Sequence, residues 1–189
     1  MPAQLQLFQN EIKYPPGFTY FPEFISQKQE EEILHILSGL SFSSFEMHGV
    51  EARRKIIHYG MKYDFLSRTA KKSGEIPLWL QDLKSQVSKL LEKEVSQILV
   101  TQYPKNAPIG WHFDAPPFES LFGLSLKNPC RFLLRKGESS NVEKIEISLE
   151  NRSGYIVSGE ARTHWQHHIP PVKEERYSIT FRTLRETHS

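Results

Sequence analysis

Several features that mark other classes of protein are missing from this 189-residue sequence. It has one cysteine, Cys130, so neither an internal disulfide nor a cysteine-based zinc site can form. No apolar run approaches the roughly 20 residues that span a bilayer, and the first residues lack the basic and apolar segments of a secretory signal. These absences predict a cytoplasmic protein with no membrane partner, and we expect a monomer.

The net charge is small, at +2, but the basic residues are concentrated in one segment. Between Arg53 and Lys72 there are seven basic residues and one acidic residue, a net charge of +6, with Tyr59, Tyr63 and Phe65 among them. Basic side chains attract phosphate, and aromatic rings stack on bases. The segment therefore suits a nucleic acid, although a solvated edge strand with a lysine-rich loop would have the same composition.

Two helices are predicted in the first half of the chain. Ser26 and Gln29 have the spacing of a capping box, and a run with apolar residues on one face follows until Gly39, a typical helix-ending residue. A second helix is predicted to begin near Pro77 and to run to about Glu94, because apolar residues recur there at helical spacing. Both helices are expected to pack on a sheet.

From residue 96 onward, short runs of β-branched and aromatic residues alternate with turn residues. The predicted strands are Gln97–Tyr103, Trp111–Asp114, Leu121–Leu126, Cys130–Arg135, Lys144–Leu149, Gly154–Val157, His164–Ile169 and Arg176–Leu184. Helices followed by strands predict an α+β fold in which the N-terminal helices buttress a barrel or a two-sheet jelly roll. There is no internal repeat and no domain boundary, so one domain over residues 1–189 is predicted.

Histidine and aspartate residues suggest a metal centre. His112 and Asp114 are separated by one residue, so on a regular strand their side chains would share a face. Three histidines follow in the second half of the chain, at positions 164, 167 and 168. Two imidazoles and one carboxylate form the facial triad of non-haem iron(II) oxygenases. A His-x-Asp pattern alone is weak support, because an isolated strand histidine is more often an ordinary surface or core residue.

The last predicted strand carries two arginines on one face. Tyr177, Ile179 and Phe181 would form its apolar face, and Arg176 and Arg182 would lie on the opposite face. Guanidinium groups suit bidentate binding of carboxylates, so the two arginines suit a small dicarboxylate. The alternative is a half-exposed strand whose polar face lies in solvent.

Together these segments resemble the AlkB family of 2-oxoglutarate- and iron(II)-dependent dioxygenases, and bacterial-type members most of all. The matching segments are GWHFD at 110–114, WQHHIP at 165–170 and RYSITFR at 176–182. Their order and spacing match the family arrangement His-x-Asp, then His, then Arg-x5-Arg. The resemblance covers roughly residues 45–185 and implies a double-stranded β-helix, or jelly-roll, core.

The resemblance implies a catalytic centre in which His112, Asp114 and His167 bind Fe(II), with 2-oxoglutarate and O2 as co-substrates. His167 is chosen over its neighbours because the family pattern Trp-x-His-x-Ile corresponds to Trp165, His167 and Ile169.

The resemblance also implies four residues that bind the co-substrate. Arg176 would bind the distal carboxylate of 2-oxoglutarate, and Arg182 would lie near the end that chelates iron. Tyr103 would help to bind it, as would Thr101, which stands where the family usually has asparagine.

On the substrate side, the resemblance implies that Arg53, Arg54 and Lys55 contact a nucleic-acid backbone. Tyr59 and Tyr63 would contact the target base, which must leave its stack to be modified.

The implied activity is oxidative demethylation, or more generally dealkylation, of damaged bases in DNA, with residues about 45–75 as a substrate-binding lid. Two alternatives stay open: the same chemistry on RNA or on a methylated protein, and a non-catalytic β-barrel binding module. Arg162 would either support the site by hydrogen bonding or form a salt bridge with an acid such as Glu160. The roles of Glu119 and His58 are undetermined.

Overall fold

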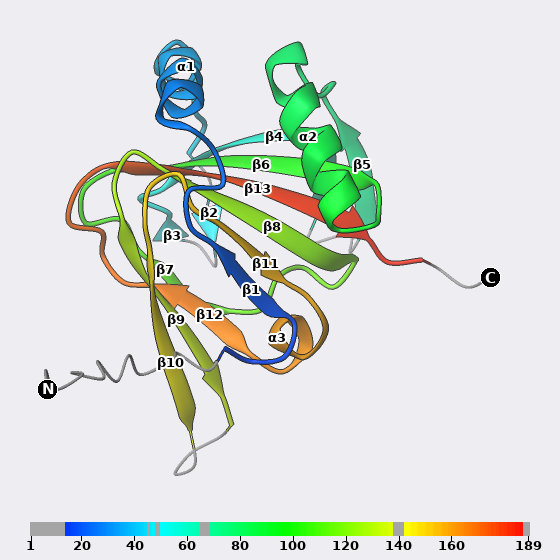
Figure 1. The fold of residues 1–189 in the computed structure, drawn as a ribbon, viewed down its shortest axis with the longest axis vertical. Coiled ribbons are helices and arrows are strands. Elements are labelled where there is room, and N and C mark those ends of the chain that lie inside the picture. The colour runs from blue at the N-terminus through cyan, green and yellow to red at the C-terminus, as the bar shows by residue number, and fades with distance from the viewer. Residues whose placement is uncertain (1–13, 45, 48–49, 65–68, 138–141, 187–189) are drawn as a thin grey trace, which may run out of the picture.

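The computed structural model describes residues 14–44, 46–47, 50–64, 69–137 and 142–186. Their strands form two larger antiparallel sheets, and two longer helices lie on one side (Figure 1). The helices are α1 (Gln27–Ser38), α2 (Leu78–Leu90) and α3 (Gly159–Thr163). The strands are β1 (Phe18–Phe21), β2 (Glu46–Met47), β3 (Val50–Glu51), β4 (Lys55–Asp64), β5 (Thr69–Ser73), β6 (Val95–Tyr103), β7 (Ile109–His112), β8 (Phe118–Leu126), β9 (Cys130–Lys136), β10 (Glu143–Leu149), β11 (Gly154–Val157), β12 (Gln166–Ile169) and β13 (Arg176–Leu184).

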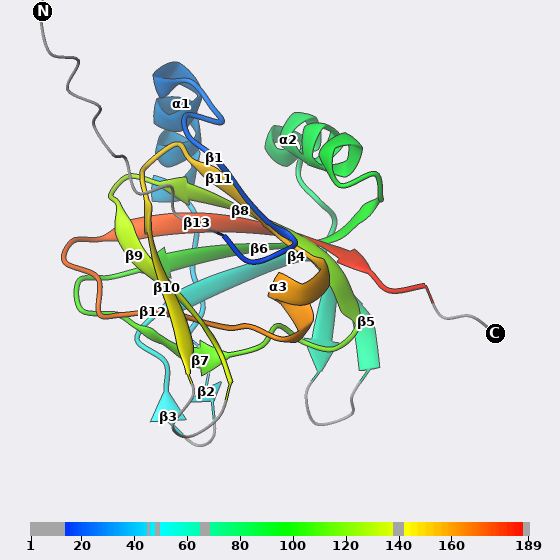
Figure 2. The same cartoon turned by 60° about the horizontal axis from the view of Figure 1, so that its bottom comes forward.

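The major sheet has seven strands in the order β1-β11-β8-β13-β6-β4-β5, and the minor sheet has four in the order β10-β9-β12-β7. Strands β2 and β3 form a separate hairpin. In Figure 2, α1 and α2 lie on one side of the major sheet and the minor sheet lies on the other. The predicted α+β jelly roll with supporting helices is therefore confirmed.

Two apolar cores hold these layers together. The helix-side core joins α1 and α2 to the major sheet and includes Leu37, Leu80 and Ile179. The inter-sheet core joins the two sheets and includes Phe132 and Tyr155, whose ring centroids lie 5.0 Å apart. A strand of the major sheet therefore buries one face against helices and the other against the minor sheet.

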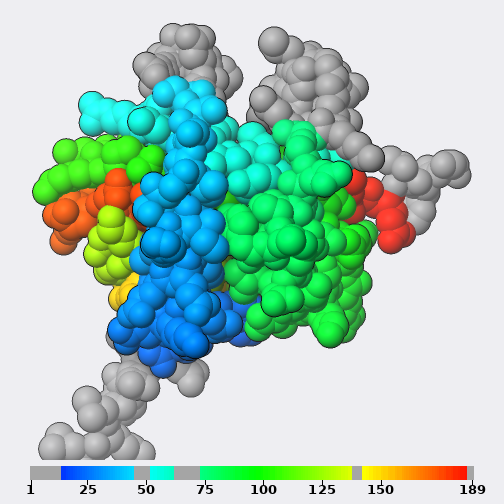
Figure 3. Space-filling model, turned by 90° about the horizontal axis from the view of Figure 1, so that it is seen from above, coloured from blue at the N-terminus to red at the C-terminus, as the bar shows by residue number. Residues whose placement is uncertain are grey.

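The residues predicted to cap the first helix cap α1 in the structure. The backbone nitrogen of Gln29 donates to Oγ of Ser26, and the backbone nitrogen of Ser26 donates to Oε1 of Gln29, so the capping box is formed. Gly39 caps the other end of α1. Figure 3 shows α1 and α2 side by side on the helical face. In the described part of the chain, no helix is both long enough and apolar enough to cross a membrane.

Several predicted boundaries were wrong, and β8, for example, begins at Phe118 rather than at Leu121. Helix α2 ends at Leu90 rather than near Glu94, because the chain turns through Glu92 (φ 52°) and buries Val95 as the first residue of β6. Strand β7 ends at His112, so Asp114 lies in the following loop. The segment predicted as one strand from His164 begins instead with the end of α3, and only Gln166–Ile169 is extended.

Strand β8 passes very close to β11 at Gly123. A Cβ atom there would lie 2.3–2.5 Å from three atoms of the Tyr155 ring. Gly123 pairs with Tyr155 on one side and with Thr180 on the other, so β8 is held between two strands. Only glycine fits this position without moving the buried ring.

We therefore expect Gly123→Ala to lower the free energy of unfolding by about 1–3 kcal/mol through overpacking. Gly110→Ala is the matched control, because a Cβ atom at Gly110 would meet nothing within 4 Å. Urea denaturation followed by circular dichroism measures both variants. Equal unfolding midpoints for the two variants would contradict the tight packing at Gly123.

Candidate active site

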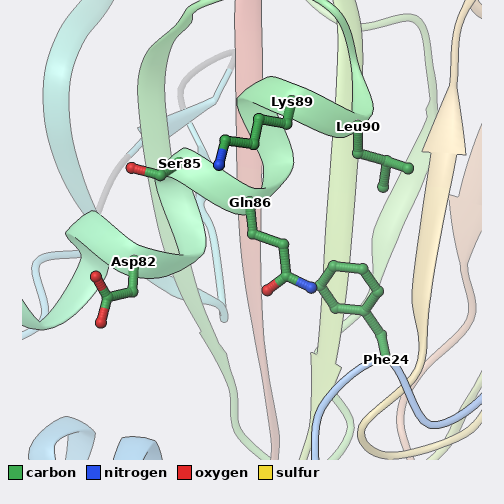
Figure 4. A pocket seen from close by; sticks show the side chains of 6 residues that line it. All are labelled: Phe24, Asp82, Ser85, Gln86, Lys89 and Leu90. Atoms are coloured by element: carbon green, nitrogen blue, oxygen red, sulfur yellow. The ribbon is translucent and has the colours of Figure 1, made fainter.

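A surface pocket lies on the helical side of the molecule, and its six labelled side chains come from α2 and from the turn that holds Phe24 (Figure 4). The lining residues are Phe24, Asp82, Ser85, Gln86, Lys89 and Leu90. They include no histidine and one carboxylate, Asp82. The chemically distinctive residues of the sequence lie on the other side of the major sheet.

The alternation of β13 determines this placement. Tyr177, Ile179 and Phe181 belong to the helix-side core. Arg176 and Arg182, on the opposite face, therefore point toward the minor sheet, as the sequence predicted. Arg176 pairs with Tyr103 across the β6–β13 ladder, and Ser178 pairs with Thr101. The four predicted co-substrate residues thus share one face of two neighbouring strands.

The three predicted metal ligands lie next to each other at the edge of the minor sheet. His112 on β7 pairs with His167 on β12, and the centroids of their rings are 4.1 Å apart. Nε2 of His167 lies 3.6 Å from Oδ2 of Asp114. Within the described ranges, no three side chains of His, Cys, Asp or Glu already form a metal-binding group. The three residues are neighbours, but their ligating atoms would have to reorient to meet at an ion.

The protonation states of these residues suit metal binding. Burial is the main cause that lowers the pKa of His112, and burial together with the charge of His112 lowers the pKa of His167 to about 3. Nδ1 of His112 lies 2.8 Å from the carbonyl oxygen of Gly110, which can only accept, so Nδ1 carries the hydrogen and Nε2 presents a lone pair. Both imidazoles are therefore neutral near pH 7, as metal ligands must be.

Asp114 is an ionised carboxylate in a buried position. Burial is the largest single effect and would raise its pKa, but the charges of the neighbouring groups, that of Arg182 first among them, together outweigh it and hold the pKa well below its usual range. Nη2 of Arg182 donates to Oδ1 of Asp114 at 2.5 Å, and Nη1 donates to Gln97 at 2.7 Å. Gln97 in turn donates to the carbonyl oxygen of Met61 on β4. This chain of hydrogen bonds connects β4 to the carboxylate, and the sequence offered no signal for the part played by Gln97.

Arg176 is the most unusual side chain in this region. It is 1% exposed, and its Nη2 donates to Oγ of Ser125 at 3.0 Å. Its guanidinium carbon lies 4.9 Å from the centre of the Tyr103 ring. Nε and Nη1 are both buried and have no hydrogen-bond partner among the residues that the structure describes. A buried cation with two unpaired donors fits a carboxylate ligand.

Ser125 was not predicted as a site residue. It lies on β8, pairs with Ser178 on β13 and is fully buried. The signal that marks it is a single polar residue in the otherwise apolar run of residues 121–126. Because the strand alternates, Ser125 faces the same side as Arg176.

Arg162 and Glu119 have definite partners. Arg162 is buried, and its Nη2 donates to the carbonyl oxygens of Asp114, Ala115 and Phe118. Of the two roles considered for Arg162, hydrogen bonding near the site is therefore the observed one, and Glu160 pairs with Lys136 instead. Glu119 pairs with Lys93.

The predicted substrate residues divide between the two faces of β4. Arg54 is half-buried and near enough to His112 to contribute to lowering its pKa. His58 pairs with Leu99, which places it on the face that bears Arg176 and Arg182. Tyr59 packs against the helix-side core, so the expected contact between Tyr59 and a base is corrected: the alternation of β4 turns this ring away from the site.

Two further predicted substrate residues, Lys55 and Arg53, do not lie at the centre of the site. Lys55 pairs with Gln102, whose side chain bonds the hydroxyl of Tyr177, so Lys55 lies on the helical face. Arg53 is exposed in the bend before β4. The side chain of Tyr63 lies outside the described residues.

Comparison with known proteins agrees with a site for a metal ion and a carboxylate ligand. The sequence profile of the 2OG-Fe(II) oxygenase superfamily matches residues 17–182. An Arabidopsis thaliana protein named "Alkylated DNA repair protein ALKBH8 homolog" is 26% identical over 200 residues, which are 91% of this chain and 56% of the relative. A Mus musculus protein named "tRNA (carboxymethyluridine(34)-5-O)-methyltransferase ALKBH8" is 26% identical over 84% of this chain and 25% of the relative. The chain thus spans about half the length of the plant relative and a quarter of the mouse relative.

The fold has solved counterparts as well. The structure of OsALKBH1 superposes with a TM-score of 0.65 at 17% sequence identity, over 90% of this chain and 98% of that one. The resemblance to the AlkB family and the expected use of Fe(II), 2-oxoglutarate and O2 are thereby confirmed, and residues 17–182 form a dioxygenase domain. The chain belongs to the 2OG-Fe(II) oxygenase superfamily, and its curated relatives include AlkB homologues.

Proposed function

We propose that this dioxygenase oxidatively dealkylates damaged nucleobases, with alkylated DNA as its first candidate substrate. The observation that carries the proposal is the position of Arg54, a cation near enough to the His112–Asp114–His167 group to help lower the pKa of His112. Exposed Arg53 precedes it in the bend before β4, whereas Lys55, the next residue, lies on the helical face. Cations beside a site that attacks an alkyl carbon suit a substrate with a phosphate backbone. A monomeric state and a cytoplasmic location stay predictions from the sequence.

His112, Asp114 and His167 would hold Fe(II), and three ligands leave positions open for the co-substrate and oxygen. When bound, the metal and 2-oxoglutarate would supply the activation of O2, which is the oxidant: one oxygen atom enters succinate as 2-oxoglutarate loses carbon dioxide, and the other hydroxylates the alkyl carbon, which is lost as an aldehyde. The protein contributes position and protonation state. Arg182 keeps one oxygen of Asp114 occupied and directs the other toward His167.

Arg176 would bind the distal carboxylate of 2-oxoglutarate through its unpaired Nε and Nη1. Ser125 orients the guanidinium, and the ring of Tyr103 lies beside it. Thr101 is buried on the same face. The inter-sheet core closes around this region, so the carboxylate would be held away from water.

RNA is the second candidate substrate. The mouse relative, whose name specifies tRNA, matches 84% of this chain. Arg54 and Arg53 suit RNA as well as DNA, because phosphate contacts carry no information on the sugar. A substrate assay is therefore needed to separate the two. Turnover of a methylated peptide alone would exclude both.

Arg176→Met should abolish tight binding of 2-oxoglutarate. Losing one partner of a buried charge pair costs about 2–5 kcal/mol, or at least about 30-fold in the dissociation constant. Stability of the ligand-free protein should not fall, because the substitution removes a buried charge that lacks two of its partners. Calorimetric titration with 2-oxoglutarate, in anaerobic Fe(II) solution, measures the affinity.

Arg131→Met is the matched control for that titration, because Arg131 is an exposed arginine paired with Glu146. It should bind 2-oxoglutarate as the wild type does. If Arg176→Met and Arg131→Met bind equally well, Arg176 is not the carboxylate-binding residue.

The substrate proposal is tested by turnover of three alkylated probes: single-stranded DNA, RNA of the same sequence, and a methylated peptide. We expect turnover of DNA, with aldehyde and succinate formed in equal amounts. Arg54→Gln should raise KM for the oligonucleotide and weaken the dependence of KM on salt, because one phosphate contact is lost. Lys28→Gln, an exposed change on α1, is the control. Turnover confined to the peptide would refute a nucleic-acid substrate.

A further inference from the structure

The loop that follows His112 is attached to a distant part of the chain by one guanidinium nitrogen. Nη2 of Arg162 lies 3.0 Å from the carbonyl oxygen of Asp114, 2.8 Å from that of Ala115 and 3.1 Å from that of Phe118. Arg162 is 5% exposed. One buried cation therefore binds two carbonyl groups of the five-residue loop 113–117 and the carbonyl group of Phe118, the first residue of β8.

Arg162 lies on the short helix α3, which backbone hydrogen bonds and burial hold in place. The backbone nitrogen of Ala161 donates to Pro16, and that of Arg162 donates to Ser158. Ala161 is fully buried in the inter-sheet core. Strand β12, which carries His167, begins three residues after α3 ends. Arg162 thus links the segment of His167 to the loop of Asp114.

This contact differs from the one made by Arg182. Arg182 binds the carboxylate of Asp114, whereas Arg162 binds its backbone carbonyl and those of two nearby residues. The backbone of Asp114 lies beyond the end of β7 and has no partner strand to hold it. Within the described contacts of this loop, the carbonyl oxygen of Asp114 receives its hydrogen bond from Arg162.

We propose that Arg162 is a positioning residue that fixes the backbone of Asp114 relative to His167, so that the two side chains can bind one metal ion. The inference rests on the proposed role of these residues as ligands. Groups that orient metal ligands typically contribute about 10- to 100-fold to metal affinity. Bonds from a charged donor to three carbonyls are strong and keep the loop from moving away.

Arg162 uses a single nitrogen for these hydrogen bonds, so two substitutions can test the proposal. All three bonds come from Nη2, and Nε of Arg162 has no partner within the described part of the chain. A lysine presents three donors on a single nitrogen and can replace this nitrogen, whereas methionine has no donor. If Arg162 only filled space, the methionine variant would bind metal at least as tightly as the lysine variant.

The measurements use metal-free full-length protein titrated with Co(II) in a calorimeter. We expect Arg162→Met to bind Co(II) about 10- to 100-fold more weakly than the wild type, and Arg162→Lys to recover most of that loss. Amide exchange gives a second readout without metal: the backbone nitrogen of Phe118, which bonds Ala115, should exchange faster in Arg162→Met. Arg131→Met is the control and should change neither value.

Several outcomes would overturn the proposal. It fails if folded Arg162→Met binds Co(II) like the wild type, or if Arg162→Lys is as weak as Arg162→Met. If Arg162→Met does not fold, Arg162→Gln replaces it in the same comparison. His167→Ala separates this test from the metal assignment itself, because unchanged Co(II) affinity in that variant would refute the ligand role whatever Arg162 does.

Discussion

The site depends on two guanidinium groups that β13 places inside the protein. This strand lies at the centre of the major sheet, and its apolar face is buried against the helices, so Arg176 and Arg182 must face the minor sheet. A buried charge is costly unless it is paired. Among the described residues, Arg182 is paired with Asp114 and Gln97 and leaves Nε without a partner, whereas Arg176 leaves both Nε and Nη1 without one. Arg176 therefore has the greater capacity to bind a ligand.

The same arrangement sets the protonation of the neighbouring groups. Desolvation keeps the imidazoles of His112 and His167 neutral, and the charge of Arg182 keeps Asp114 ionised. A carboxylate and two neutral imidazoles are the forms that coordinate a divalent cation. The protein thus prepares the ligands electrostatically, although their ligating atoms still have to reorient around an ion.

Backbone contacts from distant segments complete the site. Met61 on β4 accepts from Gln97, and the carbonyl of Asp114 accepts from Arg162 on α3. Strand β4 and helix α3 are therefore both connected to the same aspartate, β4 through Gln97 and Arg182 and α3 through Arg162. A change in either segment is expected to reach Asp114 through hydrogen bonds rather than through apolar packing.

The sequence by itself determined the features that depend on local periodicity. The capping box at Ser26, the strand Arg176–Leu184 and the direction of Arg176 and Arg182 follow from spacings of two to four residues. The motifs around His112 and His167 identified the family for the same reason: their residue types and spacings can be read along the chain.

Only the tertiary structure decided which segments meet. Pairing of β12 with β7 brought His167 beside His112, and pairing of β4 with β6 turned Tyr59 toward the helices. Register between strands and the path of a loop depend on packing over the whole molecule, and no short spacing encodes them. For that reason the sequence named Asp114 but did not reveal that Arg162 holds it.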